Sequence, residues 1–264
     1  PRKVLPYRSV NENQFLRGAA VTLGIKKVDL SLFYSKKSVD GNLNEDSLDQ
    51  QASYFTALQI SGFHRTEAEL ADKNKIEEQV MGFNLETKVK DISIGLTSVQ
   101  YDYTPALKKA YRPYQYHDFT GNKLNNTGAY YHGLLGKLYV FGETAINGFQ
   151  ASTLSSLNGF ILPLSNYIEL AAIYRYYSPE YNGIYYGPFR EQSRAKNEMG
   201  LYTGVNVKFR DDLNLKLYLD RFRFPWLRFQ TDQPSRGLEY LAELQYRPSR
   251  KFEMYGRIKS QIKE

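Results

Sequence analysis

Hydrophobic and polar residues alternate with a period of two along most of the chain. From 213 to 220, leucine occupies every odd position, and Asn214, Lys216, Tyr218 and Asp220 occupy the even ones. Successive side chains of a β-strand point to opposite faces of its sheet, so this alternation predicts strands with one apolar and one polar face. It predicts about twelve strands, at 15–24, 26–35, 51–62, 82–89, 92–103, 128–136, 137–145, 149–161, 166–177, 197–209, 212–221 and 237–247, and a further one at 251–262.

The predicted strands are joined by tight turns and by long polar loops. Tight turns are predicted at Lys90-Asp91, Asn147-Gly148, Asp211-Asp212 and Pro248-Ser249, and long loops at 36–50, 104–127, 178–196 and 222–236. Outer-membrane β-barrels combine short periplasmic turns with longer outer loops. The alternation of short and long joins fails around 145–166, so either a strand is divided wrongly there or one outer loop is short.

Two segments depart from the simple strand pattern. Thr66 and Glu69 have the spacing of a helix capping box, and residues 67–80 are rich in helix-forming residues, which predicts one short loop helix near 65–80. Within 92–103 the apolar parity changes, from even positions up to Leu96 to odd positions from Val99 onwards. A β-bulge near Thr97-Ser98 would produce this change.

A soluble β-sandwich and a membrane β-barrel both contain alternating strands. All but one of the predicted strands are roughly 9–13 residues long, whereas strands of globular proteins have a mode of about 5–6 and tilted membrane strands need about 9–11. The chain also contains 23 tyrosines, whose apolar ring and polar tip suit a boundary between hydrocarbon and water. These features favour an all-β, antiparallel transmembrane β-barrel.

The polar positions of several strands are densely charged, and in a barrel they would face the lumen. The residues that we expect to face it are Glu169, Arg175, Glu198, Lys208, Lys216, Glu239, Glu243, Glu253, Arg257 and Lys259. Both signs are equally represented, so these charges are expected to pair across strands and narrow the interior. Bulky residues such as Tyr202 and Tyr218 also favour a partly filled interior over a wide porin.

Composition limits the remaining possibilities. The 264 residues show no shift in composition, so a single domain spanning 1–264 is expected. The chain has no cysteine for a disulfide or a thiolate metal site, and no apolar run long enough for a transmembrane helix. Its net charge of +7 is spread out, which argues only weakly for nucleic acid. Because the chain starts at Pro1 and ends on Lys263-Glu264 rather than on an aromatic residue, it is expected to be processed, or incomplete at one or both ends.

Candidate chemistry is sparse. The three histidines, His64, His117 and His132, show no metal-binding spacing, and no G-x-S-x-G elbow marks a nucleophile. We therefore expect no catalytic site, cofactor or metal. The approach to the predicted helix, His64-Arg65, could dock a partner, but a solvated approach to the helix cap is the favoured interpretation.

A basic and aromatic segment spans 221–229. It could bind nucleic acid by charge and stacking, or lie at the membrane interface. We favour the interface, with Trp226 and Phe229 at the lipid boundary.

Three motifs resemble one known group of proteins. They are Ser61-Gly-Phe-His-Arg-Thr-Glu-Ala-Glu-Leu70 with Lys73-Asn-Lys75, Phe141-Gly-Glu-Thr-Ala145, and Asn197-Glu-Met-Gly-Leu-Tyr-Thr-Gly204. Over about residues 50–260, the chain resembles the barrel portion of Bacteroidota outer-membrane proteins that are labelled helix-hairpin-helix proteins, after a separate N-terminal region related to the competence protein ComEA. That region is not visible here, so the resemblance implies an outer-membrane location but does not carry over DNA binding.

Together these patterns predict a non-enzymatic barrel in the outer membrane of a Gram-negative bacterium, serving as a structural or accessory subunit of an outer-membrane assembly or as a narrow channel. Its expected partners are outer-membrane lipids, lipopolysaccharide and other outer-membrane proteins. An outer-membrane enzyme acting on lipid or protein, and a DNA-uptake component, remain alternatives.

Overall fold

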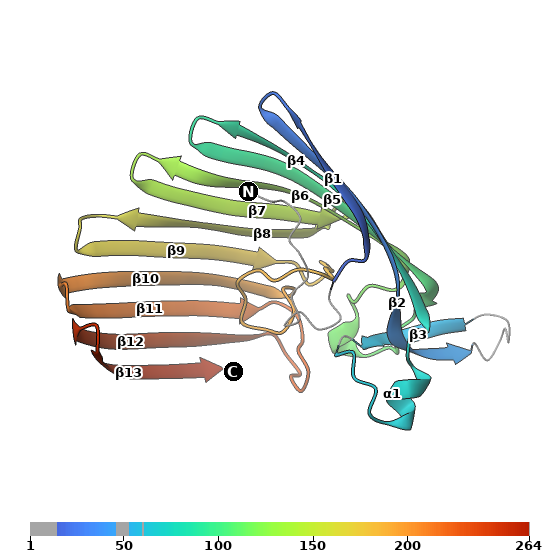
Figure 1. Ribbon diagram of the computed structural model, residues 1–264. Helices are drawn as coiled ribbons and strands as arrows, with labels where there is room; N and C mark the ends of the chain where they lie inside the picture. The colour runs from blue at the N-terminus through green and yellow to red at the C-terminus, as the bar shows by residue number, and fades with distance from the viewer. Residues whose placement is uncertain (1–14, 46–52, 60, 264) are drawn as a thin grey trace.

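The computed structural model describes residues 15–45, 53–59 and 61–263, whose thirteen strands form one strongly curved sheet (Figure 1). The strands are β1 (Gly18–Ile25), β2 (Val28–Glu45), β3 (Ser53–Gln59), β4 (Ile76–Val89), β5 (Ile92–Leu107), β6 (Gly121–Leu135), β7 (Leu138–Asn147), β8 (Gln150–Pro163), β9 (Ile168–Tyr177), β10 (Glu198–Arg210), β11 (Leu213–Phe224), β12 (Ser235–Ser249) and β13 (Phe252–Lys263). One helix, α1 (Glu67–Ala71), and a 3-10 turn, Pro113–Gln115, complete the described elements. The all-β fold class, the number of strands and the presence of a short loop helix are confirmed.

Neighbouring strands pair in antiparallel fashion from β4 through β13. The long strand β2 pairs with β1 along one edge, and with β4 and then β3 along the other. A two-residue parallel contact joins β3 to β5. Within the described residues, β1 and β13 each pair with one neighbour, so the antiparallel barrel is open between these two strands.

The joins sort to opposite ends of the sheet (Figure 1). Two-residue turns at 26–27, 90–91, 136–137, 211–212 and 250–251 lie at one end, and the long segments lie at the other. The β7–β8 join at the long-loop end is also tight, with Gly148 and Phe149 at φ +52° and +60°. Two residues of positive φ are typical of a hairpin turn of type I′. The irregularity around 145–166 is therefore one short loop among long ones.

The outer face of the sheet is apolar and uncovered in the described part of the chain. Large apolar side chains on this face are more than a third exposed, namely Val21, Leu23, Ile25, Leu32, Met81, Leu85, Val89, Ile94, Leu96, Phe160, Leu201, Leu217, Leu219, Tyr240, Leu244, Met254, Ile258 and Ile262. On β2 and β4, the outward charges Lys36 and Glu77 form an ion pair of 3.0 Å beyond this apolar band, toward the long loops. The apolar positions of β12, from Leu238 to Tyr246, extend about 27 Å along the strand.

An apolar core lies on the inner face near the long-loop end. It includes Phe55, Ile76, Val80, Tyr101 and Tyr103, each at most 5% exposed. This core explains the change of apolar parity in β5. The β4–β5 register runs without interruption from Ile92 to Thr104, so the predicted bulge near Thr97-Ser98 is wrong. The side chains of β5 alternate without a break along the strand. Its apolar residues lie on the outer face near the tight turn and on the inner face at the core.

The helix α1 is shorter than the helix that the sequence predicts near 65–80. The capping box is present, since Thr66 Oγ1 accepts from the Glu69 amide at 3.2 Å and Glu69 Oε2 accepts from the Thr66 amide at 3.3 Å. The helix ends at Ala71, Asn74 has φ +53°, and β4 starts at Ile76. Burial of Ile76 and Val80 in the core outweighs the helix propensity of this segment. No helix in the described part of the chain is both long and apolar enough to cross a membrane.

Candidate functional site

Three long loops converge at one end of the sheet. They are the β5–β6 loop (108–120), the β9–β10 loop (178–197) and the β11–β12 loop (225–234). The β9–β10 loop runs along the inner face and contacts strands from both halves of the sheet (Figure 1). The site is therefore built where one loop fills the interior and two others pack against it.

The β9–β10 loop connects two strands that are far apart in the sheet. Tyr185 donates to both carboxylate oxygens of Glu78 in β4 at 2.8 Å, and Glu191 pairs with Lys263 of β13 at 2.6 Å. Strands β4 and β13 lie nine strand spacings apart along the sheet. The curved sheet surrounds the loop, which occupies the interior at this end (Figure 1).

An arginine holds the loop against the wall. Arg175 of β9 is fully buried, with Nε donating to Glu198 at 2.5 Å and the two terminal nitrogens donating to Asp220 at 2.8 and 3.1 Å. Glu198 also accepts from the backbone amides of Glu191 and Gln192. Because every charged group of this set is hydrogen-bonded, the ion pairs hold Glu198 in place, and Glu198 fixes the loop to β10 through the two amides. We call Arg175, Glu198 and Asp220 the arginine anchor.

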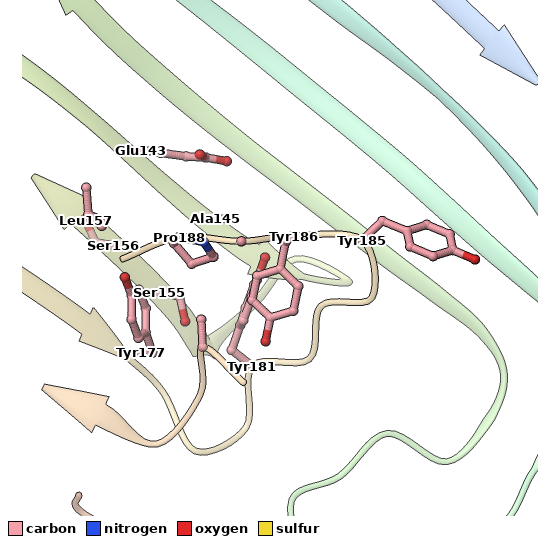
Figure 2. Close-up of a pocket in the computed structure, with 12 residues that line it drawn as sticks. Glu143, Ala145, Ser155, Ser156, Leu157, Tyr177, Tyr181, Tyr185, Tyr186 and Pro188 are labelled. Carbon is pink, nitrogen blue, oxygen red and sulfur yellow. The ribbon is translucent and has the colours of Figure 1, made fainter. Parts of the chain in front are cut away.

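A cavity of about 410 Å³ separates part of the loop from strands β7 to β9 (Figure 2). Its lining includes Tyr177, Tyr181, Tyr186 and Glu143, and none of the lysines or arginines that the structure describes. Burial raises the pKa values of Tyr181 and Tyr186, so both hydroxyls stay neutral. We call this space the tyrosine cavity.

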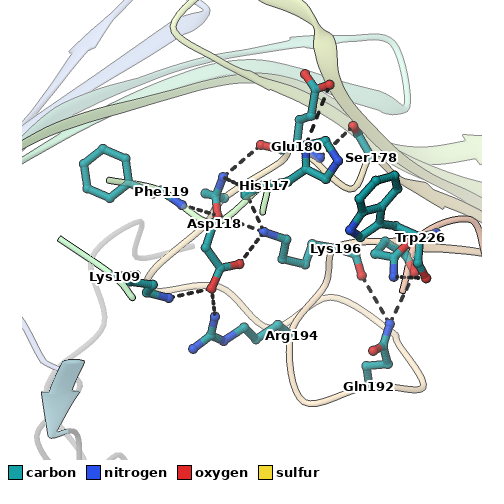
Figure 3. A network of polar contacts seen from close by, with 12 residues as sticks. Lys109, His117, Asp118, Phe119, Ser178, Glu180, Gln192, Arg194, Lys196 and Trp226 are labelled. Carbon is teal, nitrogen blue, oxygen red and sulfur yellow. Dashed lines mark hydrogen bonds and ion pairs between the residues drawn. The ribbon is translucent and has the colours of Figure 1, made fainter. Parts of the chain in front are cut away.

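A second set of charges joins the β5–β6 and β9–β10 loops (Figure 3). Asp118 accepts from Lys109 at 2.6 Å, Lys196 at 2.7 Å and Arg194 at 3.1 Å. The Asp118 side chain is only 5% exposed, and those of Lys109 and Lys196 are 17% and 13% exposed. Burial alone would raise the pKa of Asp118, but attraction to Lys196 and Lys109 outweighs it and lowers this pKa to about 2. We call these four residues the cationic cluster.

A cavity of about 540 Å³ adjoins the cationic cluster. Four cationic side chains, Lys109, Arg190, Arg194 and Lys196, line it, together with Tyr103, Phe119, Tyr185, Tyr186, Gln115, Asn182 and Ser193. Among the described residues no carboxylate lines this space. Burial lowers the pKa of Lys196, and this effect outweighs the attraction to Asp118, which raises the same pKa. We call this space the cationic cavity.

The third loop is attached through the tryptophan. The Trp226 ring lies edge-on to His117, with centroids 4.8 Å apart, and its Nε1 donates to the Pro113 carbonyl at 3.0 Å. Asn197 Oδ1 accepts from the Trp226 amide at 2.6 Å. Burial lowers the pKa of His117, which keeps its ring neutral at pH 7. The loops therefore meet around Trp226, next to the cationic cluster.

The ten charged residues expected in the lumen all lie on the inner face by strand register, the face that carries the β9–β10 loop. Several are paired. The pairs are Arg175 with Glu198, Lys216 and Arg257 with Glu243, and Lys259 with Glu239. Glu253 accepts from Gln245 at 2.7 Å. Glu169 and Lys208 lie near the tight-turn end, away from the converging loops.

The two expected interfacial aromatics lie in different surroundings. Trp226 is partly buried between loops, whereas the Phe229 side chain is 65% exposed and lies edge-on to Tyr114. That these two residues lie at the lipid boundary stays a prediction.

The histidines lie apart from one another. His64 contacts Asp40 at 2.9 Å, His117 lies against Trp226, and the His132 ring stacks on the ring of Tyr130. In the described ranges, no three His, Cys, Asp or Glu side chains are grouped as metal ligands would be.

Comparison with known proteins gives structural likeness alone. No protein-family model matches the chain, and no curated protein does. Wzi from Escherichia coli, described as an outer-membrane protein involved in group 1 capsule assembly and as a carbohydrate-binding β-barrel, aligns at 9% identity and a TM-score of 0.44 over 94% of this chain. The chain covers 66% of the length of that protein.

OpdQ from Pseudomonas aeruginosa aligns over 94% of this chain and 76% of its own length, at 11% identity and a TM-score of 0.35. Both TM-scores are below 0.5, so we draw nothing about function from either likeness.

Proposed function

We propose that this protein is an integral, non-enzymatic β-barrel of the outer membrane of a Gram-negative bacterium. Its uncovered apolar outer face supports this location, because soluble proteins rarely expose apolar surface on this scale. With the usual strand tilt of about 35–45°, the apolar stretch of about 27 Å along β12 crosses about 19–22 Å of the membrane, most of the apolar band of about 25 Å in outer-membrane barrels. The resemblance to Bacteroidota barrels supports the same location.

We further propose that the barrel is a structural or accessory subunit of an outer-membrane assembly, or a narrow channel, and not an open porin. The observation that carries this is the β9–β10 loop, bound to β4 through Tyr185 and to β13 through Glu191. The buried arginine anchor holds the middle of the same loop. A loop fixed at three places inside the wall leaves little room for ions to pass.

Planar-bilayer recording of the protein purified from outer membranes tests this proposal. We expect low conductance from the native protein, and a clear increase when residues 183–190 are replaced by a short Gly/Ser linker. The control Asp212→Asn lies in a tight turn at the opposite end and should leave the conductance unchanged. Large, stable conductance steps from the native protein would contradict a filled interior.

A further inference from the structure

We propose that the cationic cavity binds a ligand through a carboxylate or phosphate group. The inference goes beyond the role proposed above, since it holds whether or not the barrel conducts ions. It starts from a charge imbalance. Lys109, Arg194 and Lys196 share one carboxylate, that of Asp118.

The fourth cation, Arg190, pairs with no carboxylate among the residues that the structure describes. Arg190 donates to the backbone carbonyls of Pro188, Gln192 and Ser193, at 3.0–3.2 Å. The other acids of the same loop have different partners, since Glu180 faces His117 and Glu191 pairs with Lys263. Four cations and one carboxylate leave a local surplus of positive charge next to the cavity.

A buried surplus of charge is costly unless a counter-charge offsets it. Lys109 and Lys196 are less than a fifth exposed, so water screens them poorly. The Arg194 side chain is 59% exposed, which leaves a solvent-facing side through which an anion can enter. An anionic group in this space would gain charge-assisted hydrogen bonds from the lysines and from the arginine guanidinium groups.

The rest of the lining fits an organic anion better than a bare ion. A space of about 540 Å³ lies within the usual range for small-molecule pockets, about 300–1,000 Å³. Tyr103, Phe119 and Tyr186 offer aromatic surface, while Gln115 and Asn182 bring amide groups that bind hydroxyls. The expected ligand therefore carries an acidic group on a body of ring size, such as a sugar acid or a sugar phosphate.

The single tryptophan of the chain gives a direct signal for binding. Trp226 contacts His117, the residue next to Asp118, so its fluorescence reports on the cluster. The purified protein is titrated with inorganic phosphate, glucuronate and glucose 6-phosphate, with glucose and matched chloride as controls. We expect a saturable change with one or more of the three anions and none with either control. Phosphate-only and glucuronate-only responses identify which acidic group the site prefers.

Three variants make the assignment specific. Lys196→Met should weaken anion binding by about tenfold or more, because a charge-assisted hydrogen bond usually contributes at least this much to affinity. Asp118→Asn removes the competing carboxylate and should tighten binding. Lys216→Met removes an inner-face lysine that pairs with Glu243 away from the cavity, and should leave binding unchanged.

If Lys196→Met fails to fold, Asp118→Asn still tests the idea through the rise in melting temperature on adding anion, which should exceed that of the native protein. Any one of three results overturns the proposal. The first is that no anion gives a saturable response, and the second is that glucose binds as tightly as the anions. The third is that the native protein, Lys196→Met and Asp118→Asn have equal affinities. Its failure would leave the conductance experiment unaffected, so the two proposals fail separately.

Discussion

The inner face holds buried charge in two opposite ways. In the arginine anchor, one guanidinium lies between two carboxylates, and the remaining acceptor capacity of Glu198 is used by backbone amides. In the cationic cluster, one carboxylate lies between three cations, beside a cavity that a fourth cation also lines. The first arrangement is closed by protein groups alone, and the second leaves positive charge facing open space.

This difference separates a structural role from a binding role. Ion pairs that are fully hydrogen-bonded hold a geometry and need nothing further. Cations that share too few acceptors are stabilised when an anion joins them. The two cavities show the same contrast in the described part of the chain: Glu143 lines the tyrosine cavity without a cation, and cations line the cationic cavity without an acid.

Removing the central residue of the arginine anchor should have the largest effect. Arg175→Met leaves the buried carboxylates of Glu198 and Asp220 without their cation, and we expect a loss of about 3–5 kcal/mol in the free energy of unfolding. Urea unfolding measures the loss, and limited proteolysis in the β9–β10 loop locates it. Arg210→Met, at an exposed arginine paired with Asp212, is the matched control. Equal stability of the two variants would show that the anchor does not hold the loop.

The contrast between the two clusters depends on the inner face being remote from lipid, and adjacent positions on β11 test that condition. Leu217 faces outward and Tyr218 inward. A lysine at the bilayer midplane on the lipid face costs about 2–4 kcal/mol, so Leu217→Lys should impair assembly much more than Tyr218→Lys. The amount of folded protein in outer-membrane fractions measures the difference. Equal tolerance at both positions would remove the basis for a membrane barrel.

The strands could be predicted from the sequence because one physical pattern repeats in all of them. Alternation located every strand, and it placed all ten charged residues on one face. It failed where the interior becomes apolar. Residues 36–45 and 76–81 were expected to be loop and helix but belong to β2 and β4, because Val39, Ile76 and Val80 pack in a core that pairs distant strands. The change of apolar parity in β5 also comes from this core, and it becomes clear only from the register of β4 and β5.

The cationic cluster could not be predicted because its members come from different loops. Lys109 and Asp118 are on the β5–β6 loop, while Arg194 and Lys196 are on the β9–β10 loop. Likewise, Asp220 alternates with leucines in β11, yet its pairing with Arg175 depends on the alignment of β9, β10 and β11.

Acid should weaken the cationic cluster, and the expected loss of free energy of unfolding is smaller than the effects of the substitutions at Arg175 and Leu217. The pKa of Asp118 is about 2 in the folded protein, below its ordinary value of 3.8. A lowered pKa stabilises the fold above the unfolded-state value, and this stabilisation is lost as the pH falls from about 4 toward 2. We expect native unfolding free energy to drop by about 1–2 kcal/mol more than that of Asp118→Asn over this interval. Parallel losses in the two proteins would mean that Asp118 is not held by its cations.

The smallest effect is expected from the histidines, which belong to neither kind of charge cluster. The triple variant with His64, His117 and His132 each changed to Gln loses the His64–Asp40 contact of 2.9 Å and the edge contact of His117 with Trp226. The His64 side chain is partly exposed, and Asp40 keeps its bond from the Asn74 amide. We therefore expect a total loss of about 1–2 kcal/mol or less, with unchanged assembly in the membrane. Metal analysis and hydrolase assays of both proteins complete the test. Stoichiometric metal in the native protein, or a hydrolytic activity that the triple variant lacks, would show that these side chains form a catalytic site and that the non-enzymatic role is wrong.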